Sequence, residues 1–183
     1  MIYELVLIIC AVVVFAVYNI TMVAMYDVPS SLSETFYLLN DERKGFGYFF
    51  TAMMWSVAFL LLPAWIGISD RLGAWECYCT PVAFAATASI CFVGAAPAFR
   101  KLGMESKVHS IAAKLAAFFA LAWCLVACWR IMYVPIIACV ITLVFGYKSK
   151  TLRLCETYWL ELAAFSATFV TLAVECIWQM LVA

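Results

Sequence analysis

Four polar side chains share one face of the last apolar segment of the chain. They are Glu161, Thr168, Glu175 and Gln179, and on a helix these positions fall within about 40° of one another. The two glutamates would lie about 21 Å apart along the helix axis. Ionisable groups inside a membrane are costly and normally face a bundle interior or a wet cavity. The pattern therefore favours a path for a proton or a cation along this face.

A structural role for the same glutamates is an alternative that the sequence leaves open. Lys114 is expected at the depth of Glu161, and Arg130 near the level of Glu175. Two ion pairs would then fix the register of two helices without doing chemistry, because paired charges lose much of their cost of burial. Arg130 can reach water at the membrane surface, so Glu175 is the residue that we expect to matter most for function.

Catalytic motifs are missing from the sequence. His109 is the only histidine, which excludes a three-histidine zinc site and a bis-histidine haem. Its position suits an ordinary surface side chain, with pH sensing as the alternative. The sequence has no nucleophile elbow, phosphate-binding loop or dinucleotide fingerprint. We therefore expect no enzyme activity, no catalytic residues, no metal site and no cofactor.

The composition defines the environment in which these residues act. Of the 183 residues, 68% are hydrophobic and 12% are charged, against about 45–50% and about 25% in a soluble domain. A water-soluble fold of this size could not bury so much apolar surface. Eleven basic residues balance eleven acidic ones, so no net charge attracts nucleic acid. The chain is expected to be a multi-pass protein of the cell (inner) membrane, with the lipid bilayer as its main partner.

Apolar runs predict six membrane-spanning helices in one transmembrane domain, 1–183. The predicted spans are about 2–25, 46–66, 77–96, 110–128, 135–150 and 155–182. Residues 111–147 as one helix would be about 55 Å long, far more than a membrane needs. The chain must therefore fold back near Arg130, and Pro135 suits the first turn of the returning helix. Five spans remain the alternative.

The distribution of basic residues predicts the orientation of the bundle. Nine of the eleven lie on the side of the loops that follow spans one, three and five, whereas Arg71 and Arg130 lie on the other side. Because cytoplasmic loops carry the excess of lysine and arginine, both termini are expected to be extracytoplasmic.

The first long loop contains a short helix of its own, predicted over residues 31–40. Ser31 and Glu34 have the spacing of a capping box, and Leu32, Phe36 and Leu39 recur on one face. We expect this helix to lie in the cytoplasmic interface of the membrane. Its role would be anchorage or, through Ser31, Glu34 and Phe36, the docking of a partner.

The expected fold is thus all-α: an integral membrane bundle of six transmembrane helices with a short cytoplasmic interfacial helix between the first two. The first functional hypothesis is a transporter or channel subunit for a proton, an ion or a small solute. The alternative is a non-transporting accessory, sensor or assembly subunit that docks a cytoplasmic protein through its loops. A chain of this length leaves open whether a homo-oligomer is needed to enclose a path.

Overall fold

The computed structural model describes residues 1–95 and 105–182, apart from the side chains of residues 73–76 and 105–109. Within this part of the chain every regular element is a helix, as the sequence predicts. The α-helices are α1 (Ile2–Tyr26), α2 (Glu34–Glu42), α3 (Tyr48–Ser69), α4 (Glu76–Ala95), α5 (Glu105–Ala127), α6 (Tyr133–Lys148) and α7 (Glu156–Val182). Two 3₁₀ turns, Asp70–Trp75 and Trp129–Ile131, connect α3 to α4 and α5 to α6.

Within residues 1–95 and 105–182, five helices are long and apolar enough to cross a membrane. These spans are Ile2–Tyr26, Tyr48–Leu72, Cys77–Ala95, Ser110–Ala127 and Glu156–Val182. Helix α6 is apolar but shorter, with 16 residues. Phenylalanines on the outer faces, such as Phe59, Phe92 and Phe118, remain exposed, which suits contact with lipid rather than with water. By helix length and composition the chain is a multi-pass membrane protein.

The predicted reversal near Arg130 is present. Helix α5 ends at Ala127, the 3₁₀ turn Trp129–Ile131 follows, and α6 begins at Tyr133. Pro135 is the third residue of α6, where its missing N–H leaves no hydrogen bond unmade. The end of the third predicted span at residue 96 and the charges Arg100 and Lys101 lie outside the described residues.

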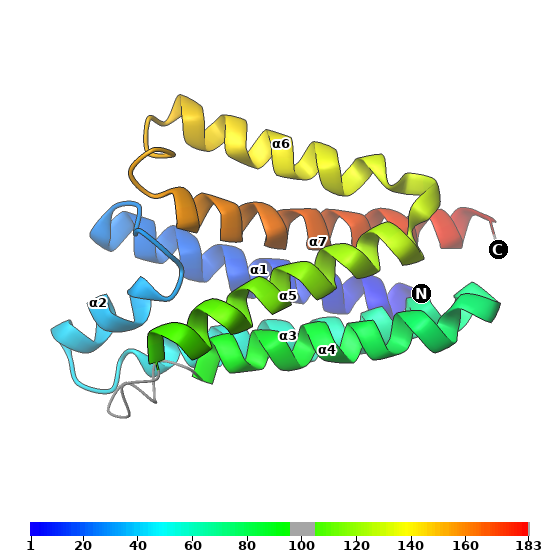
Figure 1. Cartoon of the computed structure of the whole chain (residues 1–183), viewed down its shortest axis with the longest axis horizontal. Helices are drawn as coiled ribbons and strands as arrows, with labels where there is room; N and C mark the ends of the chain where they lie inside the picture. The colour runs from blue at the N-terminus through cyan, green and yellow to red at the C-terminus, as the bar shows by residue number, and fades with distance from the viewer. Residues whose placement is uncertain (96–104, 183) are drawn as a thin grey trace.

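The bundle has two distinct ends. Helix α1 begins and α7 ends at one of them, called here the termini end, where the turns Asp70–Trp75 and Trp129–Ile131 also lie (Figure 1). Helix α2 lies at the opposite end, called here the α2 end, with the α6–α7 loop and the start of α5. Residues near the start of α7 therefore lie at the α2 end, and residues near its end lie at the termini end.

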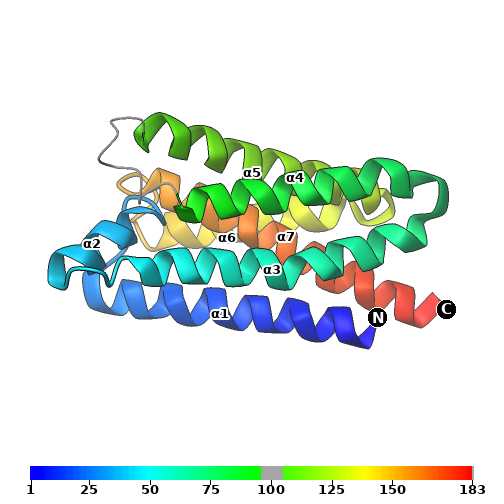
Figure 2. The same ribbon diagram turned by 90° about the horizontal axis from the view of Figure 1, so that it is seen from below.

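Helix α7 occupies the centre of the bundle. It contacts α1, α3, α5 and α6, and Figure 1 shows α6 packed on its outer side. Figure 2 shows α1 and α3 running side by side along the length of the bundle. A polar face on α7 consequently meets other helices rather than lipid.

Small residues and interhelical hydrogen bonds bring α3 and α4 together, as expected where lipid surrounds the helices. The hydroxyl of Thr51 donates to the carbonyl of Gly94 at 2.7 Å, and the indole N–H of Trp55 donates to the carbonyl of Cys91 at 3.0 Å. A Cβ atom on Gly94 would lie only 2.9 Å from the Cβ of Met54. The glycine is therefore needed for this close approach.

The apolar face of the short helix α2 packs against a different surface from the one predicted. The sequence predicts that Leu32, Phe36 and Leu39 insert into the membrane interface, but these side chains are 2%, 7% and 8% exposed and pack on the bundle. The hydroxyls of Thr35 and Tyr18 are hydrogen-bonded at 2.6 Å. The apolar face of α2 is buried in protein because the connections on both sides turn the helix back over α1 and α3. The prediction that this face anchors the helix in the membrane interface is therefore wrong.

Candidate functional site

The polar face of α7 is divided between two cavities. Glu175 and Gln179 line a cleft at the termini end, whereas Glu161 lines a polar cavity at the α2 end. Thr168 lies between them and is 3% exposed, with its hydroxyl donating to the carbonyl of Ala164 in its own helix. The helical spacing of these residues explains why they share a face, and the packing of α7 explains why that face is internal.

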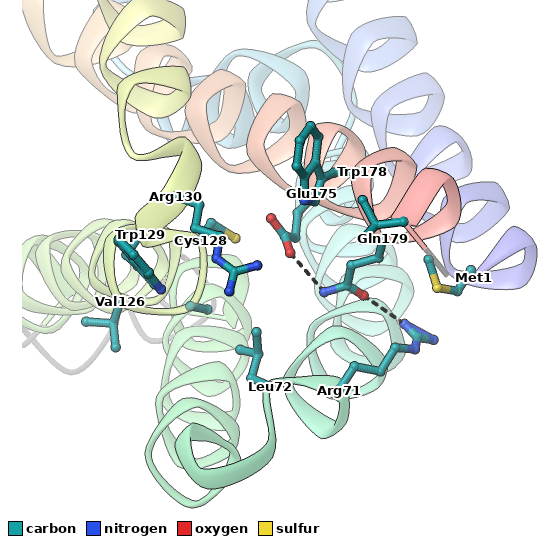
Figure 3. A pocket seen from close by; sticks show the side chains of 12 residues that line it. Met1, Arg71, Leu72, Val126, Cys128, Trp129, Arg130, Glu175, Trp178 and Gln179 are labelled. Carbon is teal, nitrogen blue, oxygen red and sulfur yellow. Dashed lines mark hydrogen bonds between the residues drawn. The ribbon is translucent and has the colours of Figure 1, made fainter.

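The termini-end cleft has a volume of about 520 Å³. Its polar lining includes Arg71, Arg130, Glu175 and Gln179 (Figure 3). Glu175 is only 7% exposed, and its carboxylate accepts a hydrogen bond from the side-chain amide of Gln179 at 2.9 Å. The carbonyl oxygen of Gln179 lies 3.5 Å from a guanidinium nitrogen of Arg71. One carboxylate is thus held by a neutral donor, inside a cleft that also contains two cations.

Glu4 is a member of this polar cluster that sequence reasoning missed. It lies in the first turn of α1, its side chain is 12% exposed, and it forms ion pairs with Arg71 and with the amino group of Met1. Gly67 makes room for it, since a Cβ atom there would lie 2.7 Å from the Glu4 carboxylate. A charged residue within an otherwise apolar first segment was the signal that could have identified it.

Arg130 does not form the predicted ion pair with Glu175. Among the side chains that the structure describes, ion pairs join Glu4 to Arg71 and to the Met1 amino group, and none joins Arg130 to Glu175. Arg130 lines the same cleft but is exposed, and its guanidinium carbon lies 5.7 Å from the centre of the Trp129 ring. The side chain stays at the rim because water and the indole ring already stabilise its charge.

At the α2 end, Glu161 accepts a hydrogen bond from the backbone N–H of Leu32 at 2.8 Å. The surrounding α2-end cavity has a volume of about 720 Å³, and Lys114 and Arg153 also line it. The predicted ion pair between Glu161 and Lys114 is not found among the described side chains. Lys114 is exposed instead. A long lysine side chain reaches water from this depth, whereas the backbone donor lies directly at the carboxylate.

The segment before α2 seals one side of this cavity. The backbone N–H of Tyr158 donates to the carbonyl of Ser30 at 3.1 Å, which ties the segment to the start of α7. The predicted capping contacts form ahead of the helix, because α2 begins at Glu34 rather than at residue 31 and its N-cap residue Ser33 makes no side-chain capping hydrogen bond. The N–H of Glu34 donates to the Ser31 hydroxyl at 3.2 Å, and the Glu34 carboxylate accepts from the N–H of Ser30 at 2.5 Å. Of the proposed docking residues, Ser31 and Glu34 are half-buried and Phe36 is buried.

Bulky side chains separate the two cavities. Trp65, Trp123 and Leu172 are at most 1% exposed, and the two indole rings meet edge to face with their centres 6.4 Å apart. The indole N–H of Trp123 donates to the hydroxyl of Ser69 at 3.0 Å. On α7, Leu172 lies between Thr168 and Glu175. We call Trp65, Trp123 and Leu172 the barrier.

A small cavity lies on the α2 side of the barrier. Its volume is about 50 Å³, and Glu161, Thr168 and Ala120 are among its lining residues. This volume is large enough for a water molecule. Glu161 lines both this cavity and the α2-end cavity, and it therefore stands at the junction between them.

Among residues 1–95 and 105–182, no group of three or more histidine, cysteine, aspartate or glutamate side chains has a metal-binding arrangement. His109 is part of α5, and its side chain lies outside the described part of the chain.

Compared with known proteins, the chain matches no family model, and no curated protein or solved structure is significantly similar to it.

Proposed function

We propose that this chain is a transporter or channel subunit that moves a proton or a small cation along the polar face of α7. The observation that carries the proposal is the position of the two α7 glutamates in separate cavities near opposite ends of the bundle, with the barrier between them. Carboxylates inside a membrane protein characteristically mark ion pathways and proton relays. Glu161 and Glu175 would bind or relay the cation, one on each side of the barrier.

The closed barrier fits an occluded state of such a path. Glu161 lines the small cavity as well as the α2-end cavity, so a cation entering from the α2 end would meet this carboxylate before the barrier. Movement of Trp65 or Trp123 would then connect Thr168 to Glu175. Transport by alternating exposure of a central site to the two sides requires such a barrier.

Flux into proteoliposomes tests this proposal. Wild type should move protons or a common cation, and Glu161→Gln and Glu175→Gln should each reduce the flux strongly. Asp41→Asn and Asp70→Asn are matched controls. Each removes an exposed carboxylate, Asp41 at the α2 end and Asp70 at the termini end, and each should leave the flux unchanged. Wild-type flux no greater than that of empty liposomes, for protons, cations and anions alike, would refute the proposal.

The proposed topology has six spans and both termini outside the cytoplasm. Helix α6 has 16 residues and is therefore about 24 Å long, somewhat shorter than a hydrocarbon core of about 30 Å. Lys148 at its end and Arg130 before its start are exposed and can extend it by snorkelling. In a background without reactive native thiols, Arg71→Cys should react with an impermeant thiol reagent in intact cells and Lys150→Cys only after permeabilisation. Equal reactivity would contradict this topology.

The second candidate function is a non-transporting accessory subunit. It is favoured by the exposed basic side chains at the α2 end, which include Arg43, Lys44 and Arg153. These charges would suit an acidic protein partner in the cytoplasm. Crosslinking followed by purification should recover one reproducible partner if this function is correct, together with no flux in the liposome experiment.

A further inference from the structure

A lateral groove lies between α1 and α6, on the outer side of α7. Its volume is about 830 Å³. Helix α1 contributes residues between Val12 and Ala24, α6 contributes residues between Ile141 and Phe145, and α7 forms the floor with residues such as Ser166. Figure 1 shows α6 and α1 on opposite sides of α7. The groove uses a different face of α7 from Glu161 and Glu175, so it is separate from the proposed path.

The length of the groove indicates what fits it. From Val12 to Ala24 it extends about 18 Å along α1, which is close to one leaflet of a hydrocarbon core about 30 Å thick. Its walls are mainly aliphatic and aromatic, including Phe15, Phe145 and Phe169. A spanning helix of a partner would need a groove across both leaflets. An acyl chain from a single leaflet needs only this length.

Two basic residues flank, in sequence, the residue that lines the groove at the α2 end. Ser149 lines the groove, and its neighbours Lys148 and Lys150 are both exposed. Lys150 has a φ of 62°, in the left-handed region that favours glycine. A lysine is uncommon in this conformation, which suggests a role for its side chain. Two ammonium groups at headgroup level complement a phosphate.

We propose that the groove binds one acyl chain of an anionic phospholipid from the leaflet at the α2 end, with the lipid phosphate between Lys148 and Lys150. The apolar walls provide the affinity for the chain, and the two lysines select the anionic headgroup. The site does not depend on transport.

Native mass spectrometry of the detergent-purified protein, titrated with phosphatidylglycerol or phosphatidylcholine, tests the headgroup contacts. Wild type should bind one phosphatidylglycerol in preference to phosphatidylcholine. Removing both charges in the Lys148→Gln/Lys150→Gln variant should weaken phosphatidylglycerol binding about 25-fold, or about five-fold per lysine. Arg43→Gln/Lys44→Gln, which removes two exposed charges from another loop at the same end, should bind like wild type. Equal loss in both double variants, or no loss in the first, would overturn the proposal.

Filling the groove tests the acyl-chain contacts in the same experiment. Ser166→Phe places a ring on the groove floor and should reduce binding of both lipids. Val170→Phe is the matched control, because Val170 is 43% exposed on the same helix and is not among the residues that line the groove. If Ser166→Phe binds both lipids like wild type, the groove does not hold the acyl chain. The same conclusion follows if a dimer of the chain excludes the lipid.

Discussion

Arg71, in the turn after α3, forms an ion pair with Glu4 in the first turn of α1, 67 residues away. The same guanidinium group lies 3.5 Å from Gln179, which in turn donates to Glu175. A chain of polar contacts therefore joins α1, α3 and α7 at the termini end. Through it, a residue that is not on α7 helps to determine the surroundings of the Glu175 carboxylate.

The Glu4–Arg71 pair should contribute measurably to stability. Both side chains are partly buried, at 12% and 32% exposure, so the pair is expected to be worth more than a surface ion pair. Glu4→Gln should lower the free energy of unfolding by about 1–2 kcal/mol. Thermal unfolding in detergent of Glu4→Gln, Arg71→Gln and the double variant measures the coupling. Additive effects of the two changes would contradict a direct interaction, and Asp70→Asn is the control.

Glu161 should act on stability through its backbone partner rather than through Lys114. Glu161→Gln keeps an oxygen that can accept from the N–H of Leu32 and should unfold close to wild type. Glu161→Ala leaves that N–H without its partner and should cost about 1–3 kcal/mol. Lys114→Met should not couple to Glu161→Gln in a double-mutant cycle. Strong coupling would instead support the ion pair expected from the sequence.

The hydrogen bond between Trp123 and Ser69 should stabilise the barrier. Both residues are buried, so Ser69→Ala leaves the indole N–H unpaired and should lower the free energy of unfolding by about 1–3 kcal/mol. Ser56→Ala, at an exposed position of the same helix, should have little effect. If the two variants unfold alike, the bond does not contribute to stability. Ser69→Ala should also raise the proposed flux if barrier movement limits it.

Gly146 should be required for the packing of α6 on α7. A Cβ atom at this position would lie 2.6 Å from the indole ring of Trp159. Gly146→Ala should therefore destabilise the protein by about 1–3 kcal/mol, the usual cost of overpacking. Trp159→Leu makes room, so the double variant should lose less than the sum of the two single changes. Strict additivity in thermal unfolding would contradict this contact.

The sequence by itself determined the features that depend on local pattern. Long apolar runs identified the helices, and the 37 apolar-rich residues around Arg130 predicted the reversal between α5 and α6, because one helix of that length would exceed the membrane. The spacing of Glu161, Thr168 and Glu175 placed them on one face, since that follows from the helical repeat alone.

Only the tertiary structure decided which groups these side chains meet. Glu161 meets the N–H of Leu32, 129 residues away, and a backbone donor has no sequence signature. Glu4 meets Arg71 because α1 packs beside α3. Leu32 and Phe36 form an amphipathic pattern that fits a membrane surface and a protein surface equally well, and the path of the connecting segments placed them against protein. Contacts between distant segments depend on how whole helices pack, which a local pattern does not contain.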